Sequence, residues 1–304
     1  MKIITLTLNP AFDTHYTVKG FVPFTENYAD YVSTQPGGKG VNIAKALKRY
    51  GKDCENIIVL GKENAVKFEQ IMEIPYTPIY ADGKIRENIT IHSDINPETR
   101  ISLDTFSLTD EYLGEIGEKI YDICDNDTVL TLTGRMPKGL SDDAVFQFCK
   151  NIKDKGTKLV IDSNSFSLAM LTDIGPWLIK PNEEEIGKFF KECHTLPEAE
   201  EIAKIIHDEG IDNVMISMGK QGIAYAGDNA CFSVNSPKIE VVSTIGAGDA
   251  SISGFIYAYA QGLNQKECVK YAVAFGSAAC LTEGTHPPFK EDIDNILKTI
   301  NSEE

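Results

Sequence analysis

The sequence predicts an α/β fold in which a mostly parallel sheet is covered by helices on both faces. Short apolar runs of strand length alternate with amphipathic helical patterns along most of the 304 residues. Parallel strands need crossover connections, and helices usually supply them. Two segments break this rhythm, 14–32 and 85–103. Both are rich in Thr, Tyr, Ile and Val and have no crossover helix between them.

The strands of the core are expected where β-rich or apolar runs end at turn or polar residues. They are residues 1–8, 57–60, 128–132, 158–162, 177–179 and 214–217. The apolar run 239–242 reads as a further strand, directly before a glycine-rich stretch.

Helices are expected where apolar residues recur at helical spacing between cap signals. Residues 38–50 show this pattern, and so does the stretch that follows Ser251 and ends near Ala260. Ser141 is placed to cap a helix that stops at Gly156. Thr195 and Glu198 form a capping box for a helix closed by Gly210.

The whole chain, 1–304, is expected to be one domain. Its core would comprise 1–13, 33–84 and 104–304, and the insertions 14–32 and 85–103 would form a lid of antiparallel strands. The alternative is that these insertions extend the core sheet.

The negative charge of the chain argues against two classes of binding partner, nucleic acids and anionic membranes. With 29 Lys and Arg against 45 Asp and Glu, the formal net charge is −16. Such a chain repels nucleic acid and anionic lipid at long range. We therefore expect no nucleic-acid or membrane partner, and any small phosphate must be held by a few local donors.

The cysteines indicate a reducing compartment. There are seven, an odd number, and no CxxC pair occurs, so reduced thiols in a cytoplasmic protein are expected. The five histidines lack metal-ligand spacing. The N-terminus does not read as a signal peptide, and no apolar run approaches the roughly 20 residues that cross a bilayer.

The stretch TIGAGDAS, 244–251, has the pattern of an anion site. A glycine-rich turn at a helix start offers free backbone N–H groups and the positive end of the helix dipole. A dinucleotide fingerprint would need glycine where Ser251 stands, and no Gly-Lys pair of the chain fits a Walker A loop.

Asp249 indicates chemistry at this turn. A carboxylate beside a bound phosphate disfavours binding, but it can accept the proton of a hydroxyl that attacks that phosphate. The alternative is an ordinary helix start, where the dipole favours an aspartate.

Three further stretches could hold phosphates. QPGGKGVN, 35–42, is a second glycine-rich helix start, and Lys39 could hold an anionic group there. LIKPNEEE, 178–185, ends a strand with residues suited to phosphate and Mg²⁺. ISMGKQG, 216–222, places a Gly-Lys turn after another strand. Taken singly, these stretches would be a flexible turn, a solvated helix start and a β-turn.

Together and in this order, the four stretches resemble the ribokinase/PfkB family of sugar kinases. The similarity runs from TLNPAFD to the final helices, and VVSTIGAGD is its most specific part. TLNPAFD, VVST and IRENI are most similar to the branch of 1-phosphofructokinases and tagatose-6-phosphate kinases. The resemblance implies a ribokinase-like three-layer sandwich with a β-sheet lid.

The resemblance also implies roles for individual residues. Asp249 would be the catalytic base, and Gly246, Ala247 and Gly248 the anion hole. The sugar phosphate would contact Asp13, Gly37, Gly38, Lys39, Asn42, Arg86 and Asn88. The nucleotide would contact Lys180, Asn182, Glu185, Ser217, Gly219, Lys220, Gly222 and Thr244, with adenine near 275–279. No side chain would bind Mg²⁺ directly; it would be held through phosphates and water, near Asn182 and Glu185.

The implied activity is phosphorylation of D-fructose 1-phosphate by ATP and Mg²⁺, giving fructose 1,6-bisphosphate. Tagatose-6-phosphate kinase is an alternative, as is a non-catalytic sugar-phosphate or nucleotide sensor. Arg135 stands where the family usually has serine, and it could add a donor for the phosphate or point to solvent. By analogy with the family, the lids of two copies could pair in a homodimer.

Overall fold

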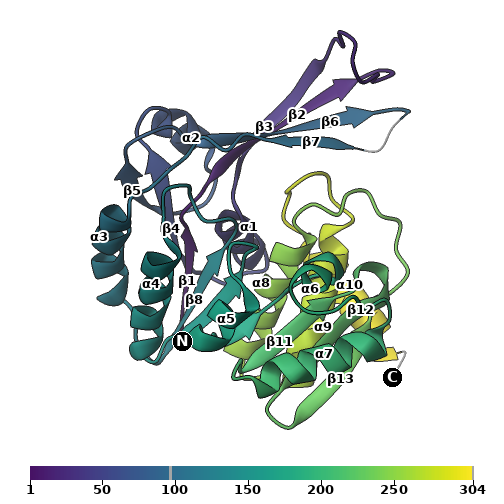
Figure 1. The fold of residues 1–304 in the computed structure, drawn as a ribbon. Coiled ribbons are helices and arrows are strands. Elements are labelled where there is room, and N and C mark those ends of the chain that lie inside the picture. Colours follow the sequence, from purple (N-terminus) through teal and green to yellow (C-terminus); the bar gives the residue numbers. More distant parts are fainter. Residues whose placement is uncertain (96–97, 303–304) are drawn as a thin grey trace.

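A computed structural model describes residues 1–95 and 98–302. Its core is a nine-stranded sheet in the order β13-β12-β11-β10-β9-β8-β1-β4-β5 (Figure 1). Strands β5 to β11 in this order run parallel, and β12 and β13 add an antiparallel edge. The strands are β1 (Lys2–Thr7), β4 (Glu55–Gly61), β5 (Thr77–Ala81), β8 (Thr128–Thr133), β9 (Lys158–Asp162), β10 (Leu178–Ile179), β11 (Asn213–Ser217), β12 (Gly222–Gly227) and β13 (Ala230–Asn235).

Helices cover both faces of this sheet, as the sequence predicts (Figure 1). Successive residues of β1 point to opposite faces, so Ile4 and Leu6 pack in one apolar cluster and Ile3 in the other. The first cluster includes α3 (Asp110–Tyr121), α4 (Asp142–Asp154), α5 (Leu168–Ile174), α6 (Glu183–Phe189) and α7 (Leu196–Asp208). The second includes α1 (Lys39–Arg49), α8 (Ala247–Ala260), α9 (Gln265–Ala279) and α10 (Lys290–Ser302).

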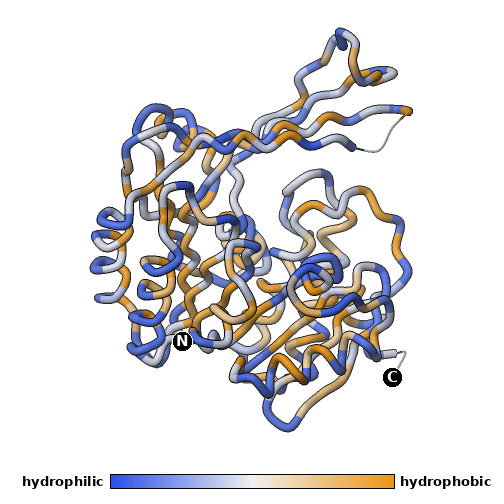
Figure 2. The backbone as a smooth tube through the Cα atoms, viewed as in Figure 1, coloured by the Kyte–Doolittle hydropathy of each residue, from blue (hydrophilic) through white to orange (hydrophobic). Residues whose placement is uncertain are grey.

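The predicted helix starts are confirmed in detail. The Ser141 side chain accepts the N–H of Ala144, and Thr195 and Glu198 form both bonds of a capping box. Figure 2 shows the resulting pattern, with apolar positions turned inward along the helices and strands. The short helix α2 (Ala65–Ile71) packs Phe68 edge-on against Phe12, at the base of the lid.

The lid is a separate four-stranded sheet in the order β3-β2-β6-β7, so the insertions do not extend the core sheet. Its strands are β2 (Ala11–Val18), β3 (Asp30–Gly37), β6 (Arg86–Ser93) and β7 (Thr99–Ser102). The pairs β2–β3 and β6–β7 are antiparallel. The expectation of antiparallel strands throughout is wrong for the central pair β2–β6, which is parallel. Both strands leave the carboxyl edge of the core sheet, one after β1 and one after β5, so they run in the same direction.

The predicted strand at 239–242 is absent. Val241 and Val242 are 57% and 59% exposed. The N–H of Val242 donates to the carbonyl of Cys280, 2.8 Å away. The segment therefore lies beside the C-terminal end of α9 and is not part of a sheet. Ile239 and Val241 instead line a cavity, and this explains their apolar character.

Within residues 1–95 and 98–302, no helix combines the length and apolar character needed to span a bilayer.

Candidate active site

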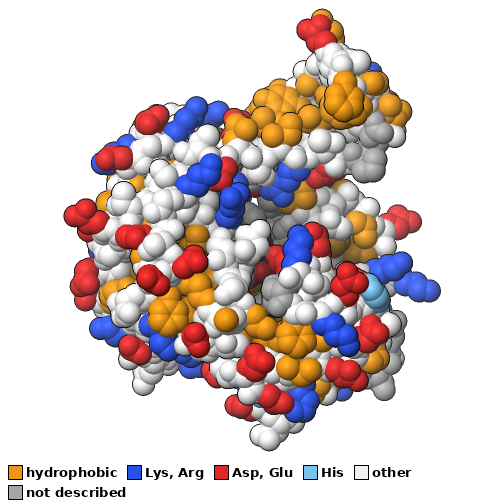
Figure 3. Space-filling view, viewed as in Figure 1, with side chains coloured by type: hydrophobic (Ala, Val, Ile, Leu, Met, Phe, Trp, Pro, Cys, Tyr) orange, Lys and Arg blue, Asp and Glu red, His pale blue; other side chains and the backbone are white. Residues whose placement is uncertain are grey.

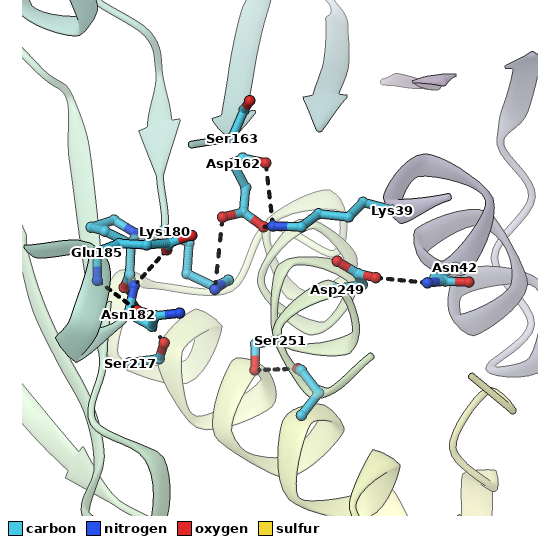
Figure 4. A network of polar contacts seen from close by, with 12 residues as sticks. Lys39, Asn42, Asp162, Ser163, Lys180, Asn182, Glu185, Ser217, Asp249 and Ser251 are labelled. Carbon is cyan, nitrogen blue, oxygen red and sulfur yellow. Dashed lines mark hydrogen bonds and ion pairs between the residues drawn. The ribbon is translucent and has the colours of Figure 1, made fainter. Parts of the chain in front are cut away.

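The residues predicted to act on phosphate meet at the carboxyl edge of the core sheet, beneath the lid. A space-filling view shows a hollow between the lid and the core (Figure 3). Open α/β sheets bind ligands at this edge because the strand ends and helix starts leave polar backbone groups there. The close view in Figure 4 shows the side chains that meet in the centre.

Asp249 lies in the first turn of α8, only 6% exposed. Its Oδ2 accepts the amide of Asn42, 2.8 Å away on α1 (Figure 4). Burial raises the pKa of Asp249 to about 6, against the opposing effect of Lys39 and the Asn42 bond. A carboxylate with this pKa is ionised at neutral pH and is a stronger proton acceptor than a solvated one.

The turn before Asp249 has the geometry of an anion site. Gly246 caps α8 in the left-handed conformation, with φ 79°, where a side chain would be strained. The first hydrogen bond of the helix runs from the Ala250 N–H to the Gly246 carbonyl. The N–H groups of Gly248 and Asp249 come before this bond and therefore have no acceptor within the helix. A Cβ at Gly248 would lie 3.0 Å from Lys180 Nζ. The ammonium group of Lys180 therefore lies directly beside the turn.

Asp162, which was not predicted from the sequence, contacts both lysines of this site, Lys39 and Lys180. It ends β9 and is 3% exposed. Its Oδ2 accepts from Lys39 Nζ at 2.8 Å, and its Oδ1 lies 3.9 Å from Lys180 Nζ (Figure 4). Burial favours the neutral acid, but the two lysines outweigh it and lower the pKa of Asp162. The signal that could have identified Asp162 is its position as the last residue of a parallel strand.

Lys39 links Asp162 to the base. Burial alone would lower its pKa, but the attraction of Asp162 and then Asp249 raises it. Lys39 is therefore charged. It lies between the carboxylates of Asp162 and Asp249, where it could also attract a bound anion.

The predicted sugar residues gather where the lid meets the core. Asn88 Nδ2 donates to Asp13 Oδ1 at 2.6 Å, and Arg86 donates to Asn88 Oδ1 at 2.7 Å. Gly37 packs against Asp13 so closely that a Cβ would overlap its carboxylate. Arg100, a second residue missed from the sequence, places its guanidinium 3.6 Å from Asp13 Oδ1.

Arg135 lies near this cluster but is paired elsewhere. Its guanidinium lies 3.2 Å from Asp104, which also pairs with Lys138, and its side chain is 60% exposed. Its carbonyl accepts from Asn9, which in turn accepts from Arg86. Arg86 thus lies deeper in the site than Arg135.

The predicted nucleotide residues divide between two adjoining cavities. A cavity of about 1180 Å³ is lined by Asn182, Ser217, Gly219, Lys220, Gly222, Thr244, Ala247 and Gly248. Lys180 and Glu185 line a smaller cavity of about 450 Å³, together with Asn182 and Asp162. Gly276 and Ser277 line the large cavity, whereas Phe275 is fully buried in the core.

Asn182 and Glu185 also cap α6. The Asn182 side chain accepts from the N–H of Glu185, and the Glu185 carboxylate accepts from the N–H of Asn182. The helix-start alternative for this stretch is therefore also realised, and the capping bonds fix both side chains at the mouth of the cavities.

Comparisons with known proteins point to one family. Residues 6–292 match the pfkB family of carbohydrate kinases. The chain is 31% identical to a 1-phosphofructokinase of Borreliella burgdorferi, over 99% of this chain and 98% of that one. It is 30% identical to a 1-phosphofructokinase of Haemophilus influenzae, over 98% and 97%. A crystal structure of phosphofructokinase-2 from Escherichia coli in complex with potassium matches with a TM-score of 0.91 at 25% identity, covering 99% of each chain.

Replacing Asp249 tests the base. We expect Asp249→Asn to lower kcat by about 10²–10⁴-fold or more, since that is the usual contribution of a general base. It should also raise the melting temperature, because the buried carboxylate is ionised at neutral pH at a cost to the folded state. In the wild type, kcat/KM should fall tenfold per pH unit below about 6, as Asp249 of the free enzyme becomes protonated. A variant that keeps more than a tenth of wild-type kcat would contradict the assignment.

Replacing Gly248 tests the turn. We expect Gly248→Val to remove most activity in a folded protein, because the new side chain must displace the Lys180 ammonium. Gly248 has no positive φ, so the effect is steric and does not come from backbone strain. The matched control is Gly114→Val on α3, where a Cβ meets nothing within 4 Å. Steady-state kinetics and circular dichroism of both variants decide the question; wild-type turnover in Gly248→Val would exclude this role.

Proposed function

The chain belongs to the pfkB family of carbohydrate kinases, and on that premise we propose that it phosphorylates D-fructose 1-phosphate to fructose 1,6-bisphosphate with ATP. The observation that carries the proposal is the buried Asp249 beside the Gly246–Gly248 turn, with Lys39 and Lys180 on either side. A sugar kinase that phosphorylates a hydroxyl group needs such a base and such an anion site together.

Each residue then has a task in the transfer. Asp249 accepts the proton of the C6 hydroxyl as that oxygen attacks the γ-phosphorus, and the bond to the β–γ bridging oxygen breaks to release ADP. The amides of the turn and the Lys180 ammonium stabilise the negative charge on the transferring phosphoryl group. Asp13 and Asn88 orient the sugar through its hydroxyls. Arg86 binds the phosphate already present on the substrate.

The donor set suits a Mg²⁺ ion bound through the nucleotide. Asn182, Glu185 and Asp162 line the smaller cavity, and within the described residues no group of three His, Cys, Asp or Glu side chains is arranged to hold a metal. Asn182 and Glu185 would hold the ion through water while phosphate oxygens supply other ligands. When bound, Mg²⁺ neutralises phosphate charge.

The choice of sugar rests on the relatives. The two bacterial relatives of 30% and 31% identity are named 1-phosphofructokinases. A fructose 6-phosphate kinase is the second candidate, because the E. coli phosphofructokinase-2 fold matches closely and has been solved in complex with fructose 6-phosphate. An ADP-release assay on fructose 1-phosphate, fructose 6-phosphate, tagatose 6-phosphate and fructose separates these candidates. The cytoplasmic location expected from the thiols stays a prediction.

Replacing Arg86 tests whether this residue binds the phosphate that the sugar already carries. We expect Arg86→Lys to raise KM for fructose 1-phosphate by about 10–150-fold, since a charge-assisted contact contributes roughly 1.5–3 kcal/mol and lysine lacks the arginine fork. KM for ATP and activity on fructose should change little. Arg135→Ser is the matched comparison, because Arg135 is exposed and already paired with Asp104. Equal losses on fructose and fructose 1-phosphate would make Arg86 a structural residue of the lid.

We also propose that two copies pair through their lids. Apolar side chains gather on the outer lid, where Figure 3 shows a cluster of them. The exposed large apolar residues of the lid segments are Val22, Phe24, Tyr28, Tyr31, Val32, Ile95, Ile101 and Leu103. Exposed patches of this kind mark interaction surfaces.

A charge on the lid should therefore prevent pairing. We expect wild type to elute as a dimer in size-exclusion chromatography with light scattering, and Val32→Asp on β3 to shift it to monomer. Val66→Asp, on the exposed side of α2, is the control and should leave the mass unchanged. A monomeric wild type at micromolar concentration would overturn the proposal.

A further inference from the structure

Two histidines of the lid form a direct contact that the proposed transfer does not use. The rings of His15 on β2 and His92 on β6 are nearly parallel, at 13°, with centroids 5.2 Å apart, and His15 Nδ1 lies 2.9 Å from His92 Nε2. His15 is 5% exposed, and its Nε2 has no hydrogen-bond partner among the described residues. His15 is thus a nearly buried titratable group two residues from the sugar-binding Asp13.

The edge of His15 faces a loop of the core. A Cβ on Gly284 would lie 3.0 Å from His15 Cε1 and 3.1 Å from Nε2. Two side-chain bonds lie beside this contact: Thr285 donates to Gln35 on β3 at 3.0 Å, and Gln35 Nε2 lies 2.8 Å from His286 Nε2. The loop 282–287 is therefore a bridge between the lid and the core.

The same loop lies beside the phosphate turn. A Cβ on Gly246 would lie 4.0 Å from the Cα of Thr285. The Thr282 hydroxyl holds the loop in shape: it lies 2.9 Å from the carbonyls of Ala279 and His286 and shares its one hydrogen between them. A contact at His15 is thus connected, through one short loop, to the turn that precedes Asp249.

The hydrogen bond of the pair requires that one facing nitrogen be unprotonated. If both rings carry two protons, two N–H groups and two positive charges face each other across 2.9 Å. The charged and titratable groups facing His15 are His92 on β6, Asp13 on its own strand, Glu98 beside β7 and Arg100 on β7. Glu283 and His286 belong to the loop. Burial, and then His92, lower the pKa of His15, so the bond is stable above the ordinary histidine range and is lost as the pH falls through the lowered value.

We propose that His15 and His92 are positioning residues: their hydrogen bond lies within the lid, between β2 and β6, and fixes the His15 ring against Gly284 of the loop 282–287. Protonation of both rings breaks the bond, displaces the His15 ring from the loop and releases the lid. The inference rests on the proposed kinase function only for its effect on the sugar. Release would withdraw Asp13, Asn88 and Arg86 from the substrate while leaving Asp249 and the Gly246 turn on the core.

The first test uses the free protein and needs no substrate. Amide hydrogen exchange of the peptide covering 282–289, corrected for intrinsic rates, is compared at pH 5 and pH 7.5. We expect wild type to lose protection at least tenfold at the lower pH. His92→Gln keeps a hydrogen-bonding amide but cannot become doubly protonated, so its protection should be the same at both values. The control, His207→Gln on α7, should behave as wild type.

The second test separates the pair from the base. Between pH 7.5 and 5, KM for the sugar phosphate should rise at least tenfold in wild type and in His207→Gln, but not in His92→Gln. The fall in kcat caused by protonation of Asp249 should be common to all three proteins. Equal exchange at both pH values, or a pH-dependent KM in His92→Gln, would overturn the proposal. If no sugar phosphate is turned over, the proposed function fails, and the exchange experiment still decides the role of the pair.

Discussion

The site depends on the burial of two carboxylates with two lysines between them. Asp162 and Asp249 are each nearly inaccessible, and a buried charge is costly unless it is paired. Lys39 and Lys180 supply the pairing to Asp162, and Asn42 supplies a hydrogen bond to Asp249. The arrangement leaves Asp162 firmly ionised and Asp249 with a pKa of about 6. Two residues of the same type thus differ in pKa because only Asp162 has a directly bonded cation.

The topology of the chain explains why these groups meet. Lys39 begins α1, Asp162 ends β9, Lys180 follows β10 and Asp249 lies in the first turn of α8. In a parallel sheet with right-handed crossovers, strand ends and helix starts lie at one edge. The lid grows from that same edge, because β2 follows β1 and β6 follows β5. The polar cluster of Asp13, Arg86 and Asn88 on the lid therefore faces the buried charged groups of the core.

Closure of such a site requires contacts that can form and break. One contact between the lid and the core joins Gln35 to the loop 282–287. This loop is adjacent to Gly246, so the position of the lid and the geometry of the anion turn are physically linked. Lid closure excludes water and completes a catalytic site in many kinases, and the lid of this chain is placed to do both.

The sequence by itself determined the α/β class, most core strands and helices, the lid insertions and the residues of the glycine-rich turns. These features depend on local pattern: apolar periodicity, caps such as Thr195 with Glu198, and glycines in turns. The strand predicted at 239–242 is wrong, because a short apolar run can line a cavity as readily as it can form a strand. Only the tertiary structure decided the parallel pairing of β2 with β6, the role of Asp162 as partner of Lys39, and the pairing of Arg135 with Asp104. Each of these joins residues far apart in the chain, and no local pattern specifies which distant side chain a buried charge will meet.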